Sequence, residues 1–432
     1  MTTPERPAFV FGPVSEGPPP PGARLVDQVE ALPPLPSPPL DKFTGTFIGN
    51  GFNTIFRPQN PATPADIKPT PVPDFNNVLE LNLTSETLTF GVKVVGPPPP
   101  KDACPSLPSV PNRGEVQGDI FLNAVPYLQT INDITGLDPN NPNPGIHFEP
   151  GLWLIVPTTT DPDEPGGPTG QTLARLASIP HGTTINAQGT FSETAGPPDI
   201  PKVDITPFKT GSPSDLVHFD SQCAAKLGTA RIPQDLAMAA GTITEEMLED
   251  PNTLLRNVVE KQTNAASQNI VKTTTISIST NPAPPLFGGG ADNIAFLLGD
   301  PSALSIARRQ QRGLISAPPL GPGPNAQALG MQATFWIETV ESKIVVPPFT
   351  PGDSALLIEA QPPLPGLPTP RFQVDPPIKI TQPQTITVTS TQIQYSQVVF
   401  LVFGRRGILT WPHVSVNTLV PFDPIVVSPT VF

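Results

Sequence analysis

Cysteine, histidine and charged residues are scarce in this chain of 432 residues. It has 2 cysteines and 4 histidines, and charged residues make up 14%. Cys104 and Cys223 are too few for a disulfide framework and lack the paired spacing of a zinc site, so free thiols are expected. No apolar stretch approaches the roughly 20 residues of a membrane-spanning helix. The start has no basic segment followed by an apolar core, which predicts a cytoplasmic protein.

Clustered positive charge is also absent. The formal net charge is −13, and no run of Lys or Arg is longer than two residues. Nucleic acids and anionic membranes attract clustered cations, so neither is an expected partner. The glycine-rich segments GTFIGNG (45–51) and FGGGADN (287–293) match neither the dinucleotide-binding nor the phosphate-loop pattern, and no GxSxG or HExxH motif occurs.

Proline is abundant instead, with 65 residues beside 34 glycines. Residues 1–40 contain Pro-rich runs, which favour an extended or disordered arm. In residues 41–205 and 329–432, alternating apolar residues separated by Pro, Gly, Asn and Asp predict β-strands. Helical signals are concentrated in residues 206–328. The sequence therefore predicts two β-rich parts separated by a partly helical insertion.

Two Asp-Pro pairs predict helix starts in this middle segment. Asp250 and Pro251 precede NTLLRNVVEKQTN, and Asp300 and Pro301 precede SALSIARRQQRG. Between the two helices, KTTTISIST (272–280) is typical of a strand. The expected fold class is mainly β, either as one antiparallel barrel closed by both β-rich parts or as two tandem barrels.

The segment GIHFEPG (145–151) is the first candidate for chemistry. Period-two geometry places His147 and Glu149 on one face of a strand, where the carboxylate can orient the imidazole. This pair is consistent with acid–base catalysis and equally with a structural hydrogen bond.

The other histidines differ in their surroundings. His413 begins the last clear strand, and a single imidazole on a barrel wall can hold an iron porphyrin. His181 lies at a turn, where polar side chains are usually solvated, and His218 has no distinguishing context.

Five short motifs occur in the same order as in the nitrobindin-like haem-binding β-barrels of the calycin group, which also includes lipocalins. GTFIGNG resembles the opening Gly-Thr-Trp-x-Gly-x-Gly of that family, with Phe47 in place of Trp. PYLQTIND is similar to its tyrosine strand, and IHFEPGLW to its His-x-Glu-x-Gly strand. ASIPHGTTINAQG resembles the Pro-x-Gly turn before the next strand. The segment IQYSQVVFLVFGRRGILTWPHVSVNTL (393–419) resembles the closing hairpin of that family, whose histidine corresponds to His413.

The resemblance implies a calycin-like barrel that binds haem b, with His413 as the metal ligand. Phe47, Leu128 and Trp153 would pack against the porphyrin. The open iron face would bind or convert a small reactive molecule such as nitric oxide, peroxide or peroxynitrite. Residues 206–328 have no counterpart in the compact family and can form a lid or fill the haem space.

Two alternatives need no metal. The barrel interior can carry an apolar small molecule, since barrels of this kind are concave and largely apolar inside. It can also house a cofactor-free isomerase or cyclase, in which His147 and Glu149 are the catalytic acid–base pair.

Overall fold

The computed structural model describes residues 39–59, 76–91, 123–135, 144–156, 172–179, 182–219, 243–283, 286, 289–293, 326–403 and 409–432. Several predictions made from sequence concern residues outside these ranges. They are the arm up to residue 38, the helix predicted after Pro301, and the side chains of Cys104, His181 and Cys223.

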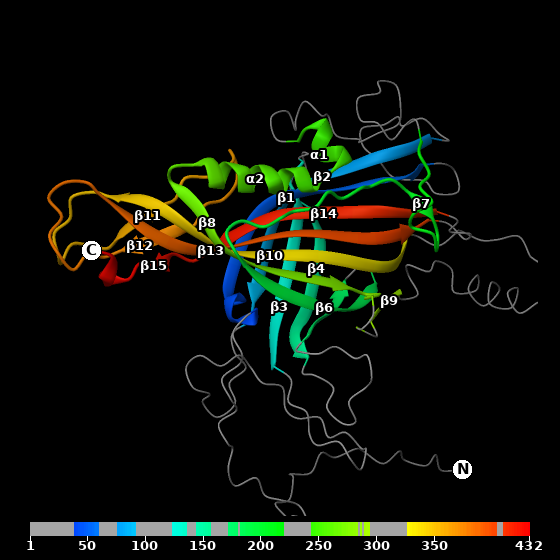
Figure 1. The fold of residues 1–432 in the computed structure, drawn as a ribbon, viewed down its shortest axis with the longest axis horizontal. Coiled ribbons are helices and arrows are strands. Elements are labelled where there is room, and N and C mark those ends of the chain that lie inside the picture. The colour runs from blue at the N-terminus through cyan, green and yellow to red at the C-terminus, as the bar shows by residue number, and fades with distance from the viewer. Residues whose placement is uncertain are drawn as a thin grey trace, which may run out of the picture. The chain divides into compact units, whose positions relative to one another are not determined.

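Ten antiparallel strands form a closed barrel (Figure 1), which confirms the predicted mainly β fold. Strands from both β-rich parts belong to one ring, and β1 pairs with β14 to close it. The segment expected as an insertion also contributes to the wall, because β8 lies between β6 and β10. In order around the ring, the wall strands are β1 (Gly45–Gln59), β2 (Asn76–Phe90), β3 (Asn123–Asp133), β4 (Gly145–Val156), β5 (Thr172–Ile179), β6 (Thr183–Ala195), β8 (Gln268–Ser279), β10 (Gln327–Val346), β13 (Gln384–Val402) and β14 (Leu409–Pro421).

Two glycines allow the close approach of strands at the seam between β1 and β14. A Cβ atom on Gly49 would lie 2.2 Å from the carbonyl oxygen of Thr418, and one on Gly51 would lie 2.0 Å from that of Val416. Both distances are far inside van der Waals contact. Any other residue at these positions would push the two strands apart, so the glycines of GTFIGNG are required by packing.

The remaining elements flank the ring. Short strands β7 (Phe208–Lys209) and β9 (Gly290–Asn293) pair with β14 and β6, and β11 (Leu356–Glu359), β12 (Arg371–Val374) and β15 (Ile425–Val426) form a separate sheet. This sheet packs on the outer ends of β10 and β13. The helices are η1 (Leu40–Lys42), α1 (Glu245–Glu249), α2 (Asn252–Asn264) and η3 (Pro429–Val431). None of the helices in the described ranges is long and apolar enough to span a membrane.

The helix predicted after Pro251 is confirmed as α2, although Asp250 does not cap it. The carboxylate of Asp250 instead accepts a hydrogen bond from the backbone N–H of Val203 at 3.0 Å and pairs with Arg256. Asp250 therefore ties the segment that follows β6 to the helix.

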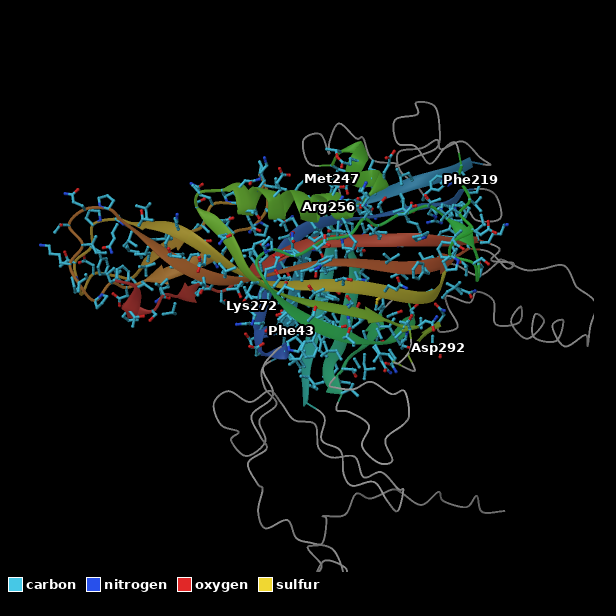
Figure 2. The ribbon with its side chains drawn as sticks, in the orientation of Figure 1. Phe43, Phe219, Met247, Arg256, Lys272 and Asp292 are labelled. Atoms are coloured by element: carbon cyan, nitrogen blue, oxygen red, sulfur yellow. The ribbon has the colours of Figure 1, made fainter. Side chains whose placement is uncertain are left out.

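An aromatic cluster fills one end of the barrel. Phe43 is labelled in Figure 2. Its ring stacks on that of Phe90 with centroids 4.6 Å apart and lies 5.4 Å from the ring of Trp153. Leu40, the last residue of the arm expected over residues 1–40, is buried in the same cluster. Leu40 of η1 and Phe43, which follows η1, therefore close this end of the barrel.

A second core lies outside the barrel, beneath α1 and α2 (Figures 1 and 2). Leu79 and Leu81, which alternate with polar residues along β2, are buried in this outer core rather than in the barrel interior. The wall is consequently covered on both faces where the helices cross it. Members of this core include Phe52, Phe56, Leu79, Leu81, Met247, Leu248, Leu255, Val258, Trp336, Val414 and Val416.

A buried carboxyl group lies under α2. Glu338 of β10 accepts a hydrogen bond from Gln392, which in turn bonds Gln262 of α2. One carboxyl oxygen of Glu338 has no hydrogen-bond partner among the described residues. Burial raises the pKa of Glu338 to about 8. The folded protein therefore binds a proton here that the unfolded chain releases at lower pH.

Because the folded protein keeps this proton to a higher pH than the unfolded chain, its free energy of unfolding falls as the pH rises from about 4.5 to about 8. We expect Glu338→Gln to be more stable than the unchanged protein by roughly 1–3 kcal/mol at the upper end of this window and equally stable at the lower end. Chemical denaturation across the window measures the effect. Glu341→Gln, a partly exposed position on the same strand, is the control. Persistence of the pH dependence in Glu338→Gln would contradict the assignment.

Candidate functional site

A cavity of about 410 Å³ lies inside the barrel, and both His147 and His413 line it. Its volume is in the range of small-molecule sites, roughly 300–1,000 Å³. None of the described residues that line it is Asp, Glu, Lys or Arg. The two histidines and Tyr395 are thus the ionisable side chains that a bound molecule would meet.

The lining of the cavity is divided into a polar half and an apolar half. The polar residues come mainly from the adjacent strands β14, β1, β2, β3 and β4, which also contribute Ile131 and Ile146. The apolar residues come mainly from β5, β6, β9, β10 and the end of β13, which also contribute Thr183 and Gln397. A molecule with both polar and apolar parts would therefore be oriented on entering. The polar half includes Asn53, Asn82, Gln129, His147, His413 and Ser415, and the apolar half includes Ile179, Ile185, Ala291, Ala328, Met331, Val399 and Leu401.

His147 is held by the carboxylate of Glu149. Its Nε2 lies 3.0 Å from Oε2 of Glu149, in keeping with their predicted position on one face of a strand. The imidazole reaches the cavity, whereas Glu149 is fully buried behind it and does not line the cavity. A bound molecule would contact His147, and Glu149 would act on it only through the imidazole.

Glu149 also forms a buried ion pair with Arg175 of β5. The guanidinium and the hydroxyl of Tyr127 both donate to Oε1 of Glu149, and Arg175 Nε donates to the Tyr127 hydroxyl at 2.7 Å. Burial opposes ionisation of Glu149, but the charge of Arg175 and hydrogen bonds from His147 and Tyr127 outweigh it and lower its pKa to about 2. Glu149 is therefore ionised at neutral pH.

Gly151 makes this arrangement possible. It is paired with Tyr127 across β3 and β4, and a Cβ atom at Gly151 would lie 2.4 Å from the tyrosine ring. Because glycine has no side chain, the ring can lie flat over β4 and bring its hydroxyl to Glu149. The glycine of the His-x-Glu-x-Gly motif thus has a local packing function in this chain.

A second buried carboxyl group, Glu86, lies close to the cavity. It accepts hydrogen bonds from Gln129 at 2.7 Å, from the Tyr395 hydroxyl at 2.5 Å and from Asn417 at 2.8 Å. Burial raises the pKa of Glu86, and these donors only partly oppose that effect. Gln129 and Tyr395 line the cavity, so they connect it to the buried carboxyl.

The residues predicted to hold a porphyrin are not brought together. His413 lines the cavity, but Phe47 and Trp153 are packed in the aromatic cluster at the end of the barrel. Leu128 alternates with the inward-facing Tyr127 and Gln129, so it points outward and is 37% exposed. Leu128 therefore does not line the interior, which corrects that expectation.

Sequence reasoning missed the charged residues that organise the site. Arg175 stands between Leu173 and Ala177 at every second position of an apolar strand, and a lone cation on such a face is a detectable signal. Glu86 had no comparable signal. It shares a face of β2 with Leu88 and Phe90, but the more regular alternation of Leu79, Leu81 and Leu83 marks the opposite face.

The described residues contain no cluster of three or more His, Cys, Asp and Glu that could hold a metal ion. Comparison of the chain with protein-family models and with curated proteins finds no match in either set.

The ion pair between Arg175 and Glu149 predicts a large loss of stability when one partner is removed. Glu149→Gln leaves a buried guanidinium without its counter-charge, so we expect the free energy of unfolding to fall by about 3–5 kcal/mol. The double variant Glu149→Leu, Arg175→Met should lose less stability than either Glu149→Leu or Arg175→Met alone.

The same ion pair predicts a dependence of stability on pH. Since the pKa of Glu149 is lowered to about 2, the contribution of its carboxylate to stability is present above about pH 4.5 and is lost as the pH falls. Denaturant unfolding at neutral and acidic pH tests both statements, and a Glu149→Gln variant as stable as the unchanged protein would refute them.

Proposed function

We propose that this protein binds a small, largely apolar molecule inside the barrel and orients it by a polar group directed at His147 and His413. The observation that carries the proposal is the division of one cavity into a polar half with both histidines and an apolar half. Transfer of the apolar part of the ligand from water into the cavity lowers the free energy, and the fixed polar groups determine the orientation of the ligand.

The polar contacts of this cavity are held rigidly. Gln397 and Gln129, which line it, both accept hydrogen bonds from Arg175, at 2.8 and 3.4 Å. His147 is held by Glu149, which is fixed by the same guanidinium. Preorganised groups lose little freedom when a ligand binds, so they favour specific binding over adaptation.

The same geometry supports proton exchange at His147. A carboxylate hydrogen-bonded to one ring nitrogen fixes the orientation of the ring, as an acid–base catalyst requires. If the bound molecule isomerises or cyclises here, His147 is the group that contacts it and Glu149 is a positioning residue. A carrier uses the same contacts without a chemical step.

A substitution that fills the cavity tests the binding proposal. Ala328 lines the cavity, whereas the adjacent Leu329 is 50% exposed and does not line it. The fluorescent apolar anion anilinonaphthalene sulfonate should bind the unchanged protein at about one molecule per chain. Ala328→Phe should weaken binding about tenfold or more, and Leu329→Phe should leave it unchanged. Cooperative melting of both variants verifies their folding. Equal binding to all three proteins would exclude the cavity.

Haem remains a second candidate because His413, the proposed iron ligand, lines the cavity. The fit is confined to that ligand, since Phe47 and Trp153 pack elsewhere and Leu128 points outward. Bound haem would supply an iron site for a small molecule such as nitric oxide, peroxide or peroxynitrite. The protein's own contribution would be the imidazole and the apolar half of the cavity.

Titration with hemin separates the two candidates. If haem is the cofactor, adding one equivalent should give a sharp Soret band that disappears in His413→Ala and persists in His218→Ala. His218 is an exposed histidine that does not line the cavity, so it controls for surface binding. A spectrum identical to that of free hemin with the unchanged protein would eliminate the haem assignment.

A further inference from the structure

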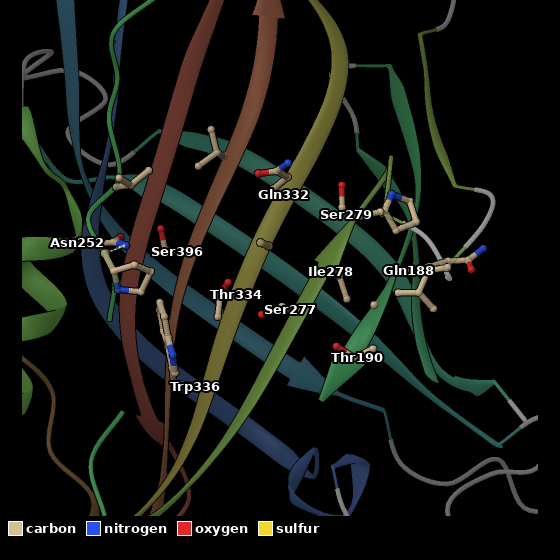
Figure 3. Close-up of a pocket in the computed structure, with 18 of the residues that line it drawn as sticks. Gln188, Thr190, Asn252, Ser277, Ile278, Ser279, Gln332, Thr334, Trp336 and Ser396 are labelled. Carbon is tan, nitrogen blue, oxygen red and sulfur yellow. Dashed lines mark hydrogen bonds between the residues drawn. The ribbon is translucent and has the colours of Figure 1, made fainter. Parts of the chain in front are cut away.

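A second hollow lies on the outer face of the barrel, across β6, β8, β10 and β13 (Figure 3). Its volume is about 560 Å³. Residues 201–203 and the start of α2 form one side, and Pro282, Ala283 and Leu286 contribute to its lining. This groove is formed by the opposite face of the wall from the cavity that holds His147.

Hydroxyl and amide side chains cross this groove in two registered rows. In the first row, Thr190 is paired with Ser277, Ser277 with Thr334, and Thr334 with Ser396. In the second row, Gln188 is paired with Ser279, and Ser279 with Gln332. Adjacent strands are about 4.8 Å apart, so the rows present neutral donors and acceptors at regular spacing.

Asn252 adds a buried acceptor at the side of the groove. It is 2% exposed, and its Nδ2 donates to the carbonyl oxygen of Pro201 at 2.7 Å. Its Oδ1 has no hydrogen-bond partner among the described residues. Buried acceptors are normally satisfied, so this oxygen is suited to accept a hydrogen bond from a molecule bound in the groove. Asn252 lines the groove, and Figure 3 shows it at the side opposite Gln188 and Thr190.

The described lining of the groove is almost free of charged side chains, which favours a neutral ligand. Among the described residues that line the groove, Lys202 is the one charged side chain and none carries a carboxylate. Neutral hydroxyl and amide groups complement a ligand that carries many hydroxyl groups, because each can both donate and accept. Val398 and Leu286, which are partly exposed, provide apolar surface for its carbon-bound hydrogens.

We propose that this groove binds a neutral carbohydrate chain, with the two hydroxyl–amide rows along its length and Asn252 Oδ1 accepting from one of its hydroxyl groups. The site is separate from the barrel cavity and does not depend on what the cavity binds.

Titration of the full chain with cellohexaose, maltohexaose and mannohexaose tests the proposal by calorimetry, with hexagalacturonate as the charged comparison. At least one neutral hexasaccharide should bind more tightly than the charged one. Thr190→Val and Thr334→Val each remove one hydroxyl, and each should raise the dissociation constant roughly 2- to 10-fold. Thr194→Val makes the same change further along β6, outside the groove, and should have no effect.

The cavity-filling variant Ala328→Phe distinguishes this site from the barrel interior, because carbohydrate binding should survive it. Absence of binding by all three neutral sugars at millimolar concentration would overturn the proposal. Equal loss in Thr190→Val and Thr194→Val, or tighter binding of hexagalacturonate, would also overturn it.

Discussion

The pairing of β1 with β14 is the constraint on which the rest of the structure depends. Two segments from opposite ends of the described chain meet there, with Phe47 opposite Pro421 and Ile55 opposite His413. Gly49 and Gly51 allow the backbones to approach, and closure removes the two free edges of the sheet. The seam also places Asn53 opposite Ser415, so the polar half of the cavity is assembled where the barrel closes.

Closure creates an interior in which charge must be compensated. Glu149 remains ionised because Arg175 is in direct contact, whereas burial raises the pKa of Glu86, which lacks such a cation. Arg175 also lies over the rings of Tyr127, Trp153 and Phe335 at 5.3–5.7 Å. One guanidinium therefore joins the aromatic end of the barrel to the polar lining of the cavity. Such pairs contribute little net stability, but breaking one is costly, which fixes the arrangement.

The wall serves two environments because side chains alternate along each strand. On β13, Gln397 points into the cavity while Ser396 faces the outer groove. On β10, Met331 lines the cavity and Gln332 and Thr334 line the groove. The two proposed binding sites thus share strands but not side chains. Each can be altered separately, and the helices cover the part of the outer face where apolar residues such as Leu79 and Leu81 are found.

The alternation of apolar residues, and the Pro, Gly, Asn and Asp residues between the alternating segments, by themselves determined the β-rich character, the start of α2 after Pro251 and the common face of His147 and Glu149. These features depend on residues close together in the chain, where the periods of strand and helix apply. Only the tertiary structure decided which face of each strand is inward, that β8 belongs to the wall, that Leu128 points outward and that Arg175 pairs with Glu149. The two-residue period predicts which side chains share a face of a strand. It does not predict whether that face is directed at the barrel interior or at the outside, because the pairing of distant strands depends on closure of the whole ring.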